Sequence, residues 1–81
     1  MARISGRTDK DKSLVRLGVA IRAKRKAVGF TQEALADAAG IDRSHVGKIE
    51  RGERNITLLN IIRIAKALGV TSSDILTSAE L

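Results

Sequence analysis

Residues 29–52 read GFTQEALADAAGIDRSHVGKIERG and contain two short helical patterns separated by a glycine. Thr31 precedes the first pattern and Asp42 the second, and both residue types are favoured at helix N-caps. The apolar positions expected to face the core are Leu35, Ala36, Ala39, Val46 and Ile49. Gly40 is suited to end the first helix, and Ile41 is expected to fill the corner. This spacing predicts a helix-turn-helix.

A longer helix is predicted before this motif, because apolar residues recur there at spacings of three, four and seven. The residues on this face are Leu14, Leu17, Ile21 and Val28. Ser13 is the expected N-cap and Gly29 the expected end.

Two helices are predicted after the motif. Thr57 is the expected cap of the first, which is apolar on more than one face from Leu58 to Leu68 and is therefore expected to be buried on two sides. Thr71 and Asp74 form a capping-box pattern that begins a last short helix. No strand pattern appears, so the sequence predicts a compact all-α domain of five helices.

Length and composition exclude several classes of protein. The 81 residues, with 43% hydrophobic and 30% charged residues, fit one globular domain. There is no Cys, and the lone His45 has no second ligand beside it, so no disulfide, metal site or cofactor is expected. With no accompanying nucleophile, no enzyme activity is expected either. No membrane span or export signal is recognisable, and a cytoplasmic location is expected.

The charge of the chain is uneven. The net charge is +6, and residues 14–29 contain five basic residues and no acidic one. Residues 1–13 have little apolar content and are expected to form a flexible basic arm, with the folded domain spanning 14–81. An excess of basic residues favours a polyanionic partner, and nucleic acid is the leading candidate.

The quoted stretch resembles the Cro/C1-type (XRE-family) helix-turn-helix of phage repressors and their bacterial relatives. The likeness covers roughly residues 14–76. The run from Asp42 to Asn55, followed by Ile56-Thr57-Leu58, is most similar to the controller proteins of restriction–modification systems. The resemblance implies a lambda-repressor-like fold and a transcriptional regulator that binds double-stranded DNA in a sequence-specific manner.

In such a regulator the second helix of the motif enters the major groove and contacts bases from its N-terminal end. With Val46 and Ile49 inward, the residues facing away from the core are Arg43, Ser44, Gly47 and Lys48. Arg43 is expected to bind a guanine with two hydrogen bonds. The alternative is a solvated residue or an ion-pair partner of Asp42 or Glu50. Ser44 and Lys48 are expected to reach bases, whereas His45 either contacts DNA or lies idle at the surface.

Phosphate contacts are expected on both sides of this helix. By resemblance, Gln32 contacts a phosphate near the start of its helix, and Arg54 with Asn55 contacts the backbone farther along. Ordinary turn chemistry is the alternative for Arg54 and Asn55. The basic residues expected to attract phosphate without selecting sequence are Arg22, Arg25 and Lys26.

One such domain reads only a short site, so a homodimer on a palindromic operator is expected. The expected interface comprises Leu59, Ile62, Val70, Ile75 and Leu76. The alternative is that these residues only complete the core of the monomer. By resemblance to lambda repressor, the acidic pair Glu33 and Asp37 is a candidate contact with RNA polymerase.

Other functions remain open at this point. Within the same class, the chain could be an autoregulatory repressor or an antitoxin-like regulator. From another class, it could be a basic helical adaptor that binds a protein partner and contacts DNA only nonspecifically. RNA binding is disfavoured, because Phe30 is the single aromatic residue and single-stranded RNA is usually held by stacked aromatics.

Overall fold

The computed structural model describes residues 9–81, which form five α-helices and no strand. The helices are α1 (Ser13–Ala27), α2 (Gln32–Ala39), α3 (Arg43–Glu50), α4 (Leu58–Leu68) and α5 (Ser72–Ser78). The predicted all-α class and the helix-turn-helix, now α2 and α3, are confirmed. The predicted flexible arm lies mostly outside the described residues.

Four of the five helices begin where a side-chain cap was predicted. The hydroxyl of Thr31 accepts from Ala34 N, that of Thr57 from Asn60 N, and that of Thr71 from Asp74 N. The carboxylate of Asp42 accepts from Ser44 N. These bonds satisfy backbone amides that have no partner within the helix, which fixes where each helix begins.

The predicted cap of α1 is wrong. Ser13 is already within the helix, and the N-cap is Lys12, in a left-handed conformation without a side-chain cap bond. Instead, the Oδ2 atom of Asp9 accepts a 2.7 Å hydrogen bond from Leu14 N. A turn in which Lys12 N donates to Asp9 O brings that carboxylate over the end of the helix.

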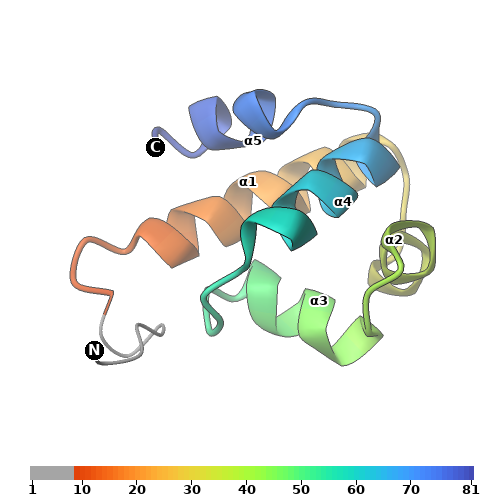
Figure 1. The fold of residues 1–81 in the computed structure, drawn as a ribbon, viewed down its shortest axis with the longest axis horizontal. Coiled ribbons are helices and arrows are strands. Elements are labelled where there is room, and N and C mark those ends of the chain that lie inside the picture. The colour runs from red at the N-terminus through yellow and green to blue at the C-terminus, as the bar shows by residue number, and fades with distance from the viewer. Residues whose placement is uncertain (1–8) are drawn as a thin grey trace.

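α1 crosses the middle of the molecule, with α3 on one side and α5 on the other (Figure 1). α2 packs against α3 and α4, and α5 packs against α1 and α4. The core is aliphatic, and its fully buried side chains are Ile21, Leu35, Val46, Ile64 and Ile75. α3 therefore lies at one edge of the domain, against α1 and α2, with its outer surface free.

α1 and α3 approach closely through glycine. A Cβ built on Gly18 would lie 2.5 Å from the carbonyl oxygens of both Ile49 and Glu50, which is closer than real Cβ atoms come. A Cβ on Gly52 would lie 2.7 Å from the Cα of Val15. The C-terminal end of α3 thus lies directly on the backbone of α1, and its position is fixed by main-chain contact.

We expect Gly18→Ala to destabilise the domain by about 1–3 kcal/mol, because the added methyl would force the backbone of α3 away from α1. A Gly→Ala substitution within a helix normally stabilises a protein by about 1 kcal/mol. A loss of stability in Gly18→Ala would therefore be opposite to the effect that helix propensity alone predicts. Gly47→Ala in α3 is the control, since the atoms nearest the added methyl there belong to the ends of the Arg51 and Gln32 side chains and not to the backbone of another helix. Urea unfolding of both variants, followed by circular dichroism, tests this. Equal stabilisation by both would contradict the close approach.

Thr71 and Asp74 form the predicted capping box at the start of α5, since Thr71 N also donates to Asp74 Oδ2 at 3.0 Å. The hydrogen bond that the Asp74 carboxylate accepts from the Thr71 backbone amide lowers the pKa of Asp74 below its ordinary value, with smaller contributions from the Thr71 side chain and the charge of Lys24. A carboxyl with a lower pKa in the folded state stabilises the fold at neutral pH, and this stabilisation is lost as pH falls through the folded pKa.

We therefore expect the stability gap between the wild type and Asp74→Asn to be constant above the ordinary pKa of 3.8 and to shrink in acid. Urea unfolding of both proteins at several pH values measures the gap. Other carboxyl groups titrate equally in both proteins and cancel in the comparison. A gap independent of pH would contradict the role of the ionised carboxylate.

The prediction that α4 is buried on two sides is wrong at its first turn. Leu58 and Leu59 are each 65% exposed, whereas Ile61, Ile64 and Leu68 are buried. Within residues 9–81, only the inner face of α4 is buried against other helices. Its outer face presents bare apolar side chains to the surface, at the end of the helix nearest the loop that follows α3 (Figure 1).

Candidate nucleic-acid interface

The N-terminal end of α3 has a capped backbone and an exposed, unpaired arginine. Asp42 accepts hydrogen bonds from Ser44 N at 2.8 Å and from Ser44 Oγ at 2.7 Å. These bonds lower the pKa of Asp42 and keep it ionised. Arg43, the first residue of the helix, is exposed, and within residues 9–81 it forms no ion pair. The alternative that Arg43 pairs with Asp42 or Glu50 is therefore wrong.

The C-terminal end of α3 is anchored by a buried ion pair with α1. Arg25 donates to Glu50 from Nε at 2.6 Å and from Nη2 at 3.0 Å, and its Nη1 donates to the Phe30 carbonyl at 2.8 Å. Both residues are buried. The expectation that Arg25 attracts phosphate is therefore wrong, because its guanidinium is buried and paired with Glu50 inside the protein.

The same Glu50 also positions Gln32. The Gln32 Nε2 atom donates to Glu50 Oε1 at 3.0 Å, which ties the first residue of α2 to the last residue of α3. This bond uses one amide hydrogen of Gln32 and leaves the other hydrogen and the carbonyl oxygen for another partner. The half-buried Gln32 side chain is thus oriented by the protein, and its phosphate contact stays a prediction.

Arg51, which the sequence analysis did not select, lies over α3 beside Gln32. A Cβ built on Gly47 would lie 3.2 Å from Arg51 Nη1 and 3.7 Å from Gln32 Oε1. Gly47 faces away from the core, as expected, and lines the Gln32 hollow, but it has little exposed surface because the Arg51 side chain lies close above it. Arg51 follows Gly47 by four residues and therefore lies on the same side of the helix axis, a spacing from which it could have been selected.

Two hollows flank α3. The Gln32 hollow is lined by Gln32, Arg43, Ser44, Gly47, Lys48 and Arg51. The His45 hollow is lined by Asp42, Ser44, His45, Lys48 and Arg54. Lys48 and Ser44 line both, so they form the ridge between them. All four residues expected to contact bases thus lie on this ridge or beside it, and basic side chains lie on both flanks.

The remaining predicted phosphate contacts are less concentrated. Arg22 lines a neighbouring hollow with Gln32 and Arg51, close to the start of α2. Lys26 is exposed near the end of α1, and Asn55 is exposed in the loop between α3 and α4, but neither lines these hollows. Of this set, the structure gathers Gln32, Arg22 and Arg54 around α3.

The residues predicted to contact RNA polymerase or to form the dimer interface do not line the hollows beside α3. Glu33 and Asp37 are both exposed on α2. Among the five residues expected at a dimer interface, Leu59 is exposed and Ile62, Val70 and Leu76 are half-buried. Ile75, by contrast, is 0% exposed and is a core residue, so it cannot line an interface as expected.

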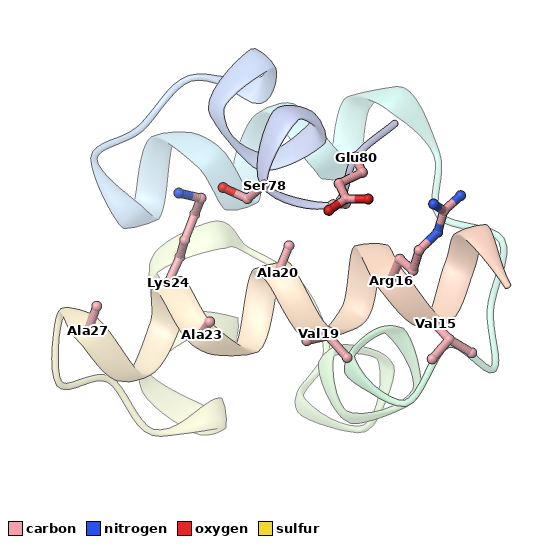
Figure 2. Close-up of a pocket in the computed structure, with 10 residues that line it drawn as sticks. Val15, Arg16, Val19, Ala20, Ala23, Lys24, Ala27, Ser78 and Glu80 are labelled. Atoms are coloured by element: carbon pink, nitrogen blue, oxygen red, sulfur yellow. The ribbon is translucent and has the colours of Figure 1, made fainter.

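A third surface, the groove between α1 and α5, is mainly apolar. Figure 2 shows Val15, Val19, Ala20 and Ala23 along α1 below Ser78 and Glu80 near the end of α5. It lies on the side of α1 facing α5, whereas α3 packs on another side (Figure 1). The groove is therefore separate from the basic surface around α3.

Two further findings concern the described residues. Within residues 9–81, no group of three or more His, Cys, Asp or Glu side chains could hold a metal ion. No helix among them is long and apolar enough to cross a membrane.

Residues 21–75, which include the whole α2–α3 unit, match the family model described as helix-turn-helix. The chain belongs to the helix-turn-helix family. The resemblance to XRE-type members is confirmed, and the chain is a DNA-binding transcriptional regulator. The second helix of the family motif is α3, the helix that carries Arg43 and Ser44 and is flanked by the two hollows.

Several relatives of this helix-turn-helix chain are control proteins. Control protein C.SmaI of Serratia marcescens is 40% identical over 57 residues, which cover 70% of this chain and 68% of the relative. Control protein C.MunI of a Mycoplasma species is 33% identical over 67 residues, which cover 82% of this chain and 90% of the relative. The crystal structure of the restriction-modification controller protein C.AhdI from Aeromonas hydrophila superposes with a TM-score of 0.76 at 45% identity, covering 76% of this chain and 94% of that one.

Proposed function

We propose that this chain is a restriction–modification controller that acts as a homodimer on a palindromic operator and has no catalytic activity. The observation that carries the proposal is the contrast between the two ends of α3. Its C-terminal end is anchored by the buried Arg25–Glu50 pair, while Arg43 at its N-terminal end is exposed and unpaired within residues 9–81. A rigid helix with a free guanidinium at its leading end suits base recognition in the major groove.

Phosphate contacts would hold the helix in register on both sides. Gln32 and Arg22 lie towards α2, and Arg54 lines the His45 hollow on the opposite flank. Asn55 and Lys26 would extend this set. Such contacts supply affinity without sequence preference, so discrimination is assigned to Arg43, Ser44, Lys48 and His45.

The dimer is proposed on the outer face of α4 and the adjacent part of α5. Leu58 and Leu59 are the most exposed large apolar side chains of the described residues, and Ile62, Val70 and Leu76 are partly buried beside the core. Covering these residues with a second copy would remove apolar area from water. A two-fold axis there would present two α3 helices to successive turns of the DNA.

Activation is proposed to involve Glu33 and Asp37, which are exposed on α2 at a spacing of four residues. Two carboxylates held close together repel each other slightly and gain nothing from DNA phosphate. A basic surface of RNA polymerase would be a suitable partner for them.

The test is a selection of bound sequences from a random duplex pool at about 150 mM salt, with the mass of the protein in solution measured in parallel. A palindromic motif bound by a dimer is expected. The absence of an enriched motif would overturn the proposal and favour a helical adaptor with nonspecific DNA binding. A motif without any effect on a neighbouring restriction–modification operon would favour an autoregulatory repressor or an antitoxin-like regulator.

A further inference from the structure

Arg51 takes part in the second ion pair at the C-terminal end of α3, which is exposed, unlike the Arg25–Glu50 pair. Its Nε donates to Glu53 Oε2 at 2.6 Å and its Nη2 donates to Glu53 Oε1 at 3.3 Å. The two side chains are 57% and 52% exposed. Arg51 also lines the Gln32 hollow, so the guanidinium held by Glu53 belongs to the surface proposed to face DNA.

Glu53 is surrounded by basic residues of that surface. Its hydrogen bond from Arg51 lowers its pKa, and the charges of Arg51, Lys48 and Arg54 lower it further. Lys48 and Arg54 line the His45 hollow. The Glu53 carboxylate therefore lies among three cations on the two flanks of α3, in an environment that favours an anion.

The fold itself has little need of this carboxylate. Exposed ion pairs contribute little to stability, because both partners remain well hydrated. The buried Arg25–Glu50 pair already anchors this end of α3. The placement of Glu53 is better explained by its effect on what approaches the surface.

We propose that Glu53 is an internal competitor of DNA phosphate that restrains the affinity of this surface by neutralising Arg51. The inference rests on the proposed DNA binding through α3. A phosphate that approaches Arg51 must displace the carboxylate or bind beside it. In either case the contact with Arg51 contributes less binding free energy. The restraint acts on phosphate contacts and therefore applies to every DNA sequence.

Such a restraint suits a small protein with a net charge of +6. Nonspecific binding derives from phosphate contacts, and bulk DNA offers a vast excess of nonspecific sites. A carboxylate among the cations lowers this background while leaving Arg43, at the other end of α3, free to read bases.

The test compares Glu53→Gln with Glu80→Gln. Both variants raise the net charge by one, but Glu80 lies in the groove between α1 and α5 (Figure 2). Glutamine at position 53 can still accept from Arg51, so the local geometry is kept. We expect Glu53→Gln to bind a random duplex roughly three- to tenfold more tightly, with a steeper salt dependence by about 0.9 per protomer. Glu80→Gln should stay within about twofold of the wild type.

Weaker binding by Glu53→Gln would show that the carboxylate orients Arg51 for DNA, which would overturn the proposal. Equal gains in both variants would also overturn it, because the effect would then be one of net charge. In an Arg51→Gln background, Glu53→Gln should raise the affinity for random DNA by a smaller factor. An equally large increase in that background would contradict the role of Arg51. All these measurements use random DNA, so they remain decisive even if the sequence selection finds no operator.

Discussion

Glu50→Ala is expected to lose about 3–5 kcal/mol of unfolding free energy, which is a large part of the roughly 5–15 kcal/mol that stabilises a typical domain. The variant leaves the Arg25 guanidinium buried beside α3 with the Phe30 carbonyl as its one remaining partner among the described residues. A charge in that position lacks both water and a counter-ion. Urea unfolding followed by circular dichroism should show a much lower midpoint.

Two controls separate the burial of the charge from the loss of an ion pair as such. Glu53→Ala breaks the exposed pair with Arg51 and should leave the midpoint close to that of the wild type. The double variant Arg25→Met/Glu50→Leu removes both buried charges and fills the space with apolar atoms, so it should recover most of the stability. A Glu50→Ala variant as stable as Glu53→Ala would show that this end of α3 is held by the glycine contacts alone.

The starts of helices could be predicted because their causes are local. Thr31, Asp42, Thr57 and Thr71 each cap an amide two or three residues away, so the short sequence contains both partners. Ser13 failed as a cap because the competing carboxylate comes from outside the expected helix, through the turn at residues 9–12.

The buried ion pair was missed because its partners are 25 residues apart and meet only when α1 packs against α3. A signal was nevertheless present. Arg25 continues the four-residue spacing of Leu17 and Ile21, and Glu50 lies four residues after Val46, so both charges fall on apolar faces. Opposite charges on the inner faces of two helices could have been paired with each other.

The division of apolar residues between core and surface could not be predicted from periodicity. α4 is apolar on more than one face, which is compatible either with burial on both sides or with an uncovered face. Among residues 9–81, only one face of α4 is covered, and Leu58 and Leu59 in its first turn remain exposed. Ile75 shows the opposite error, because it was predicted to lie at the dimer interface but is buried in the core.

Arg43→Ala is expected to produce the largest loss of operator binding. A bidentate contact between arginine and guanine discriminates by about 1–3 kcal/mol, and a homodimer has two such contacts on one operator, for a total of about 2–6 kcal/mol. Binding titrations against the selected operator should therefore show a loss between about 30-fold and about 20,000-fold. The fold should be unaffected, because the Arg43 side chain is exposed and the Asp42 cap does not involve it.

Arg43→Lys distinguishes base recognition from charge. Lysine keeps the positive charge at the leading end of α3 but lacks the planar pair of donors that matches a guanine edge. The variant should therefore bind random DNA as the wild type does, yet lose most of its preference for the operator, and a repeated selection should show relaxed choice at one base pair in each half-site. Gln32→Ala should do the opposite and weaken operator and random DNA by similar factors. If Arg43→Lys retained the full preference, α3 would be reading the bases through Ser44, His45 or Lys48, and Arg43 would belong with the phosphate contacts.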